Sequence, residues 1–223
     1  MSTGQTPFLG QLGRQDAEAL LQRARRRTIR KSHLILREGS AGDEVAIVLT
    51  GRVKLVASGA EGRDVVLAIR GPGELIGEMA ALGGIRRTAT AIAVDDVEVG
   101  YLDARGLRDF LNEHSAAALV LVRMVIRRWA DADRDRISLA TQDSVGRLAS
   151  RLLELGEHHG AQTEHGVRIE LSLSQDELAS WTGATRETVS RALRLMRGLG
   201  WIATDHRAIT ILDVTALRER SGG

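Results

Sequence analysis

The stretch LSQDELASWTGATRETVSRALRLM, Leu173–Met196, decides how the C-terminal part of the chain folds. Ser174 and Glu177 have the spacing of a capping box, which predicts the start of a helix. Ala179 and Gly183 follow, with an aliphatic residue six positions after the glycine. A small residue, a glycine and an aliphatic residue at this spacing let two helices cross closely through a tight turn. The stretch therefore predicts a helix-turn-helix.

The second helix of this motif presents a polar edge at its N-terminal end. Arginine can form a bidentate contact with guanine, and glutamate can accept a hydrogen bond from the amino group of cytosine. Hydroxyl side chains beside them can bind phosphates or bases, and Thr185 is expected to cap the second helix. The residues expected to contact DNA are Ser174, Thr185, Arg186, Glu187, Thr188, Ser190 and Arg191. The alternative is a solvated helix face with an i,i+4 ion pair between Glu187 and Arg191.

The segments around this motif differ in their residue patterns and therefore in their predicted secondary structure. GWIATDHRAITIL, residues 200–212, predicts a strand pair forming a wing with Arg207 near its tip. Residues 1–13 are expected to form a flexible arm, and residues 14–27 an amphipathic helix. From residue 28 to 103, short β-branched runs separated by glycines predict an antiparallel sandwich or barrel, with a hairpin loop at Gly59–Gly62.

A long helix is expected after residue 114. Roughly 28 residues from Ser115 contain no glycine or proline, after a short helix over 104–114. Leu119, Val122, Ile126 and Trp129 keep the three–four spacing of a coiled-coil seam. A dimer seam is favoured over packing on the same domain, because this helix is longer than a small barrel needs. A further helix from about residue 144 and a strand over VRIELSLS follow, with the boundary between the halves near residue 140.

Composition excludes several classes of protein. The chain has no cysteine, so disulfides, cysteine-ligated zinc and the usual iron–sulfur ligands are excluded. The six histidines show no metal-ligand spacing, and His158 and His159 are expected in a solvated polar turn. No run reaches the roughly 18 apolar residues of a membrane span, and no signal core is present. We therefore expect a cytoplasmic protein that is not an enzyme, since no nucleophile–base or metal constellation is found.

The motif RETVSR, Arg186–Arg191, and the order of the predicted elements resemble the CRP/FNR (catabolite-activator) family of bacterial transcription regulators, over residues 8 to 215. The resemblance implies an α+β fold with a cyclic-nucleotide-binding β-roll or jelly roll at 14–113. It implies a dimerisation helix at 114–140 and a winged helix-turn-helix at 141–223. It also implies a homodimer on a palindromic operator, with GTGA-like half-sites read by Arg186, Glu187 and Arg191, and RNA polymerase as a further partner.

GELIGEMAALGGIRRTAT, Gly73–Thr90, resembles the phosphate-binding cassette of cyclic-nucleotide-binding domains. The N-terminus of a helix offers free backbone N–H groups to an anion, and an arginine can form a bidentate hydrogen bond with a cyclic phosphate. The resemblance assigns ligand binding to Gly77, Glu78, Met79, Arg87, Thr88 and Ala89. Two alternatives stay open: Arg86 as the phosphate-binding arginine, and a cassette that is only scaffold.

The resemblance leaves more than one nucleotide open as the ligand. Cyclic AMP is the leading candidate, and cyclic GMP or another nucleotide is the alternative. The family positions that contact adenine correspond to Ala132 and Asp133, and neither is a hydroxyl residue. Asp133 could accept from a base amine, better from guanine than adenine, or pair with Arg134 or Arg136 across a dimer. Neither metal, haem nor an iron–sulfur cluster is expected. The competing functions are a ligand-independent regulator of the same fold and a nucleotide-binding regulatory subunit.

Overall fold

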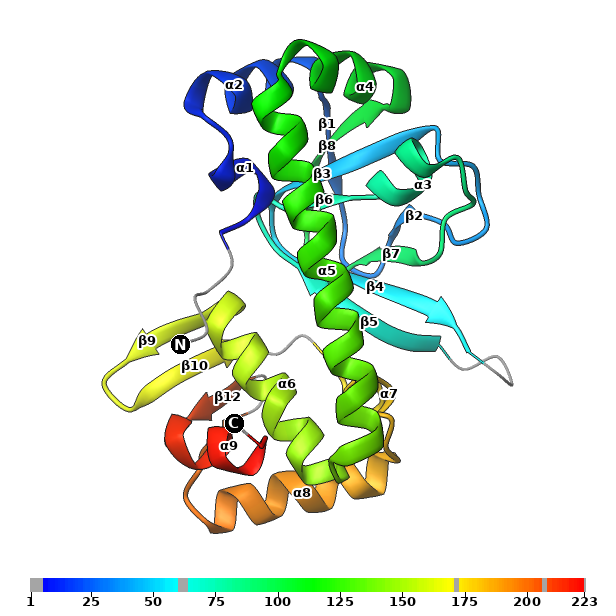
Figure 1. The fold of residues 1–223 in the computed structure, drawn as a ribbon. Coiled ribbons are helices and arrows are strands. Elements are labelled where there is room, and N and C mark those ends of the chain that lie inside the picture. Colours follow the sequence, from blue (N-terminus) through cyan, green and yellow to red (C-terminus); the bar gives the residue numbers. More distant parts are fainter. Residues whose placement is uncertain (1–5, 60–63, 171–172, 206–207, 223) are drawn as a thin grey trace. The chain divides into compact units, whose positions relative to one another are not determined.

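The computed structural model describes residues 6–59, 64–170, 173–205 and 208–222 of the 223-residue chain (Figure 1). The described residues form two compact units, one ending at Ala130 and the other beginning at Asp131. The division falls inside one continuous helix, α5 (Ser115–Thr141), about ten residues before the boundary expected from the sequence.

The first unit, Thr6–Ala130, combines short strands with helices before and after them. Its elements are α1 (Phe8–Gln11), α2 (Arg14–Arg23), β1 (Arg25–Ile29), β2 (Leu34–Leu36), β3 (Glu44–Thr50), β4 (Val53–Ser58), β5 (Asp64–Arg70), β6 (Leu75–Ile76), α3 (Glu78–Gly83), β7 (Thr90–Ala93), β8 (Val97–Asp103), α4 (Ala104–Glu113) and the first part of α5.

These strands form the predicted antiparallel sandwich. The sheets have the orders β1-β8-β3-β6 and β2-β7-β4-β5. Strand β3, with the sequence EVAIVLT, explains why the two sheets stack, because apolar side chains lie on both of its faces. Ala46 and Val48 lie in a core shared with the second sheet, whereas Val45 and Ile47 lie in a core shared with the helices. A strand buried on both faces reads as a continuous apolar run rather than an alternating one.

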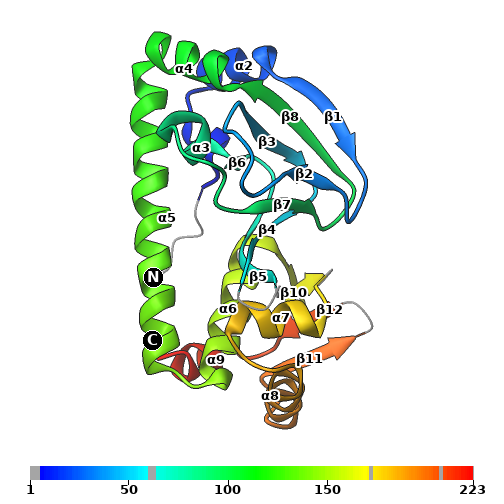
Figure 2. The ribbon, with the colours of Figure 1, turned by 90° about the vertical axis from the view of Figure 1, so that its right-hand side faces the viewer.

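The helices cover the outer face of the first sheet (Figure 2). Phe8, Leu20 and Phe110 are fully buried there, and α5 contributes Ala117, Leu121 and Met124. Burial of each large apolar side chain stabilises the fold by about 1.5–3 kcal/mol. This layer therefore fixes the N-terminal part of α5 to the sandwich that carries the cassette.

The second unit is mainly helical, with a four-stranded sheet of order β11-β12-β10-β9. Its elements are the rest of α5, α6 (Ser144–His159), β9 (Gly160–Thr163), β10 (Gly166–Glu170), α7 (Gln175–Thr182), α8 (Arg186–Gly198), β11 (Ile202–Asp205), β12 (Ala208–Ile211) and α9 (Val214–Arg220). The antiparallel pair β11–β12 is the predicted wing. Arg207, predicted at its tip, lies outside the described residues.

The N-terminal segment differs from the expectation in two ways. The expected arm is shorter, because Phe8–Gln11 is helical and Phe8 is fully buried. The amphipathic helix ends at Arg23, and Arg25–Ile29 is a strand paired with β8. Backbone pairing with β8 therefore overrides the good helix propensity of the arginines.

Two other predicted turns have different outcomes. The expected polar turn at His158 and His159 is wrong, because both residues are helical and form the C-terminal end of α6. The hairpin β9–β10 follows directly. The strands β4 and β5 do pair as a hairpin, from Val53↔Arg70 to Ser58↔Asp64. The expected loop Gly59–Gly62 is described only at Gly59, because residues 60–63 lie outside the described ranges.

Candidate functional site

The predicted helix-turn-helix is formed by α7 and α8. The capping box is present, with the Ser174 hydroxyl accepting from the Glu177 backbone N–H at 3.2 Å. Helix α7 ends at Thr182 and is capped by Gly183, whose φ of 59° is the left-handed conformation that glycine adopts at little cost. Thr185 then caps α8 by accepting from the backbone N–H of Thr188 at 3.2 Å. Both caps predicted from the sequence are confirmed.

Helix α8 has one buried face and one exposed polar face. Val189, Leu193 and Met196 are buried, whereas Arg186 and Arg191 are exposed. The Arg186 guanidinium is 3.8 Å from the Asp176 carboxylate, and Arg191 donates to the Thr188 hydroxyl at 3.4 Å. A separation of 3.8 Å between exposed charges is a weak interaction that a stronger partner can replace. The guanidinium groups are thus presented outward.

Glu187 lies between these arginines and is exposed. A hydrogen bond from its own backbone N–H, followed by one from the Thr185 hydroxyl, lowers the pKa of Glu187 below its ordinary value of 4.5. The charges of Arg186 and Arg191 act in the same direction. At neutral pH the side chain is a carboxylate, which accepts hydrogen bonds and donates none.

The other predicted DNA-contacting residues lie around this face. Thr188 and Ser190 are half-buried on α8, and Thr185 is exposed at its start. The hydroxyl of Ser174 is already engaged, since it also donates to the Glu177 carboxylate at 2.9 Å. A DNA contact by Ser174 would therefore compete with the cap of α7.

The cassette places Arg87 against Gly77 in the first unit. Arg87 is buried, and its Nη2 donates to the Glu44 carbonyl at 2.7 Å, with the Asp43 carboxylate 3.6 Å away. Its Nη1 is buried without a hydrogen-bond partner in the described part of the chain. A buried unpaired donor costs roughly 1–3 kcal/mol, so a guanidinium in this state is suited to receive an anion.

Gly77 is required beside this arginine. Its φ is 86°, and a Cβ built there would lie 2.6 Å from the Nη1 atom of Arg87. Any other residue would be strained and would collide with the guanidinium. The glycine therefore makes room for the charged group rather than only for a turn.

The remaining cassette residues differ in how exposed they are to solvent. Thr88 is exposed, Ala89 is half-buried, and Met79 points outward with 52% of its surface exposed. Arg86, the alternative phosphate-binding residue, is exposed and donates to the Gly39 carbonyl at 2.7 Å. Because this hydrogen bond holds Arg86 against the backbone of Gly39, Arg87 is favoured as the anion-binding residue.

Glu78 is buried, and its carboxylate faces an arginine that the sequence interpretation overlooked. Arg128 on α5 donates to Glu78 at 2.8 Å, to Glu74 at 2.5 Å and to the Leu75 carbonyl at 2.9 Å. A signal was present in the sequence, because Arg128 continues the buried α5 row of Leu121 and Met124 at helical spacing. Arg128 connects α5 with the cassette.

Asp133 lies on the part of α5 that belongs to the second unit, whereas the cassette belongs to the first. Its carboxylate pairs with Arg136 one turn along α5, at 3.1 Å. This ion pair lies within one chain, and the pairing across a dimer that the sequence suggested stays a prediction.

Other kinds of site are not found within the described residues. Among these residues, no cluster of three or more histidine, aspartate or glutamate side chains could hold a metal ion. No helix among them is long and apolar enough to cross a membrane.

Comparisons with known proteins agree with this arrangement. A model of the cyclic nucleotide-binding domain matches residues 26–114, and a model of the Crp-like helix-turn-helix domain matches residues 146–220. The "CRP-like cAMP-activated global transcriptional regulator" of Mycobacterium tuberculosis is 30% identical over 191 residues, covering 86% of this chain and 85% of that protein. Transcriptional regulator SdrP of Thermus thermophilus is 34% identical over 188 residues, covering 83% and 89%.

Solved structures show the same fold. FixK2 from Bradyrhizobium japonicum matches with a TM-score of 0.79 and 24% identity, covering 90% of this chain and 98% of that one. A transcriptional regulator of the CRP family from Thermus thermophilus matches with a TM-score of 0.75 and 27% identity, covering 88% and 97%. The chain, with its cyclic nucleotide-binding domain and Crp-like helix-turn-helix, therefore belongs to the CRP/FNR family of transcription regulators and is not an enzyme.

Proposed function

We propose that the protein is a homodimeric, sequence-specific DNA-binding regulator whose two α8 helices read a palindromic operator. The observation that carries the proposal is the exposed row of Arg186, Glu187 and Arg191 at the N-terminal end of α8. The guanidinium groups suit guanine, and the carboxylate suits the cytosine amine. GTGA-like half-sites, known from the family resemblance, contain base pairs of this kind.

The exposed face of α5 supports the dimer. The four seam residues, Leu119, Val122, Ile126 and Trp129, are between 53% and 67% exposed, although they are large and apolar. The opposite face of the same helix, with Leu121 and Met124, is buried on the sandwich. An apolar stripe at coiled-coil spacing favours association with an equal stripe, since this removes apolar surface from water.

The cassette supports control by a cyclic nucleotide. Arg87 would hold the cyclic phosphate, with backbone N–H groups after Gly77 and the Thr88 hydroxyl as further donors. Glu78 would accept from the ribose 2′-OH. Cyclic AMP is the first candidate, because the Mycobacterium tuberculosis relative is named as cAMP-activated. Cyclic GMP is the alternative, because the carboxylate of Asp133 could accept two hydrogen bonds from the two-donor edge of guanine.

A bound nucleotide would act by shifting a conformational equilibrium. It can do so only to the extent that it binds one arrangement of the dimer more tightly than the other. The two α8 helices must lie roughly 34 Å apart to enter successive major grooves. The regulator would work on the bacterial chromosome in the cytoplasm, where RNA polymerase is a further partner.

The test is a titration of labelled duplex carrying two inverted GTGA half-sites, with no nucleotide, with cyclic AMP and with cyclic GMP. We expect preference over a scrambled duplex and tighter binding with one of the nucleotides. Preference that no nucleotide alters would support the second candidate, a ligand-independent regulator. Equal binding to both duplexes under all conditions would contradict the proposal.

A further inference from the structure

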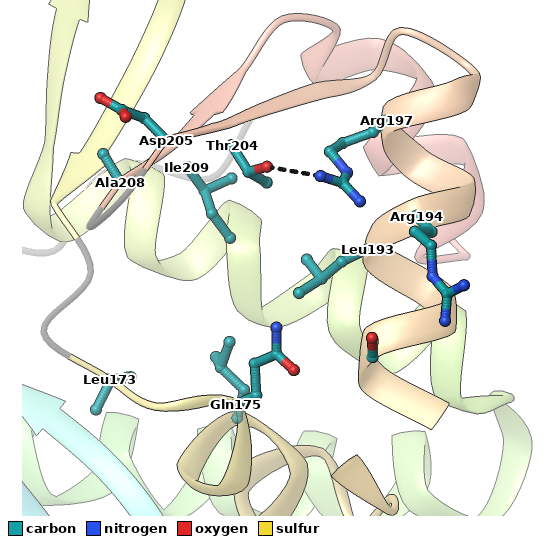
Figure 3. A pocket seen from close by; sticks show the side chains of 11 residues that line it. Leu173, Gln175, Leu193, Arg194, Arg197, Thr204, Asp205, Ala208 and Ile209 are labelled. Carbon is teal, nitrogen blue, oxygen red and sulfur yellow. Dashed lines mark hydrogen bonds between the residues drawn. The ribbon is translucent and has the colours of Figure 1, made fainter. Parts of the chain in front are cut away.

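A pocket lies between α8, the start of α7 and the β11–β12 wing (Figure 3). Its volume is about 270 Å³, and five apolar residues line part of it: Leu173, Leu178, Leu193, Ala208 and Ile209. The rest of the lining is polar: Gln175, Ser190, Arg194, Arg197, Thr204 and Asp205. Small-molecule sites are typically larger and lined mostly by apolar groups, so this pocket suits a small charged group better.

Two arginines give the pocket its charge. Arg194 and Arg197 both come from α8 and are exposed to solvent. Within the described part of the chain, Arg194 has neither an ion pair nor a hydrogen bond from its side chain. The acid at the rim, Asp205, has Arg168 of β10 as a partner at 3.5 Å. The pocket therefore presents more positive than negative charge.

Arg197 is held in place by the wing. Its Nη1 donates to the Thr204 hydroxyl of β11 at 3.2 Å, the interaction drawn in Figure 3. A guanidinium has five N–H donors, so most stay available to an anion. Because the side chain is already positioned, binding costs less conformational entropy than for a free arginine.

The length of α8 indicates what reaches the pocket. The helix has 13 residues, which corresponds to about 20 Å at about 1.5 Å per residue. The major groove of B-DNA is about 12 Å wide. If the N-terminal end of α8 enters the groove, the C-terminal half extends beyond it, toward the sugar–phosphate backbone. Arg194 follows the predicted base-contacting Arg191 by three positions, on the same side of the helix.

We propose that this pocket binds a backbone phosphate of the duplex beside the base pairs that α8 reads, and that Arg194 and Arg197 are its phosphate-contacting residues. The inference rests on the proposed DNA-binding function and adds a phosphodiester site to it. Its contacts carry no base information, so they add affinity and fix the register of α8 on the duplex.

The experiment measures the affinity of the full chain for the GTGA duplex and for a scrambled duplex at several salt concentrations. The variants are Arg194→Gln and Arg197→Gln, and the control is Arg218→Gln, which removes the same charge from α9, outside the pocket. Each lost phosphate contact reduces the magnitude of the slope of log K against log salt by about 0.9 per subunit. We expect this from both pocket variants, with equal weakening on both duplexes, and an unchanged slope from the control.

Thr204→Val provides a variant that keeps every charge. We expect weaker binding to both duplexes, because Arg197 loses the hydroxyl that holds it, with little change in the slope. Unchanged slopes in both arginine variants would overturn the inference, and so would a changed base preference, since that indicates base reading. If the wild-type chain shows no preference for either duplex, the proposed function itself fails.

Discussion

At the scale of single residues, the pair Arg87 and Gly77 is the clearest sign of a ligand. The chain buries a guanidinium, leaves its Nη1 without a hydrogen bond to the described residues, and places a glycine at φ 86° to make room for it. The unpaired buried donor costs stability in the ligand-free protein. A residue that served only the scaffold would gain stability from full pairing, so the arrangement favours anion binding.

This leads to a prediction for the cassette. Arg87→Gln should abolish binding of cyclic nucleotide, because the amide keeps some hydrogen bonding but loses the charge and the bidentate fork. Arg86→Gln is the matched control and should bind normally. Isothermal titration with cyclic AMP and with cyclic GMP measures the effect. Equal loss in both variants, or in neither, would show that Arg87 does not hold the phosphate.

A second residue-scale prediction concerns base reading. Arg186→Ala should weaken binding to a specific duplex by about 1–3 kcal/mol and relax the preference at one base pair. Competition among duplexes that differ at single positions measures both effects. The scrambled duplex is the control, since its affinity should change little. Uniform weakening on every sequence would instead identify Arg186 as a phosphate contact.

At the scale of elements, the sequence predicted those that local chemistry determines. The strands β3, β4 and β5 follow from β-branched runs between glycines, and α7 and α8 from their caps. The end of α2 at Arg23 could not be predicted in this way. The arginines of β1 are strand residues because they pair with β8, and Arg27 stacks on Tyr101 at 5.7 Å. These contacts join segments more than 70 residues apart.

Half-buried arginines that form ion pairs were the other class that the sequence analysis did not identify. Arg151 on α6 is held by Asp135 at 2.8 Å and Glu154 at 2.7 Å, and it stacks over Trp181 at 5.0 Å. Burial opposes its charged form, but the carboxylates of Glu154 and Asp135 outweigh this and raise the pKa of Arg151. From sequence alone an arginine is expected to be solvated. Only the tertiary structure shows that residues of α5, α6 and α7 contact Arg151.

The cap of α6 gives a pH-dependent prediction. The backbone N–H of Gly146, followed by the side chain of Arg220, lowers the pKa of Asp143 below its ordinary value of 3.8. A lowered folded-state pKa stabilises the fold above the ordinary pKa, and this stabilisation is lost as the pH falls through the folded value. Asp143→Ala should therefore cost about 1 kcal/mol at neutral pH and less in acid.

Urea unfolding of both proteins from neutral pH down to acid measures this difference. Thr141→Ala, at the exposed end of α5, is a suitable control for changes in that region. A difference between wild type and Asp143→Ala that does not shrink toward low pH would contradict a role for the ionised carboxylate.

At the scale of the whole molecule, the prediction is a dimer that depends on the seam of α5. Ile126→Glu should yield a monomer, because it places a charge in an apolar contact that must be desolvated. The control is Arg127→Gln, which makes the same change in net charge beside the seam. Sedimentation velocity measures the mass of each. A dimer that survives Ile126→Glu, or an unmodified chain that is monomeric, would show that α5 does not form the seam.

The most direct test of the central claim is selection of bound duplexes from a random library by the purified full-length chain, with and without cyclic AMP and cyclic GMP. The claim is that two copies of α8 read DNA together. It predicts enrichment of two inverted half-sites with their centres one helical turn, about 10–10.5 base pairs, apart. Enrichment of no motif, or of a single unpaired half-site, under every condition would contradict it.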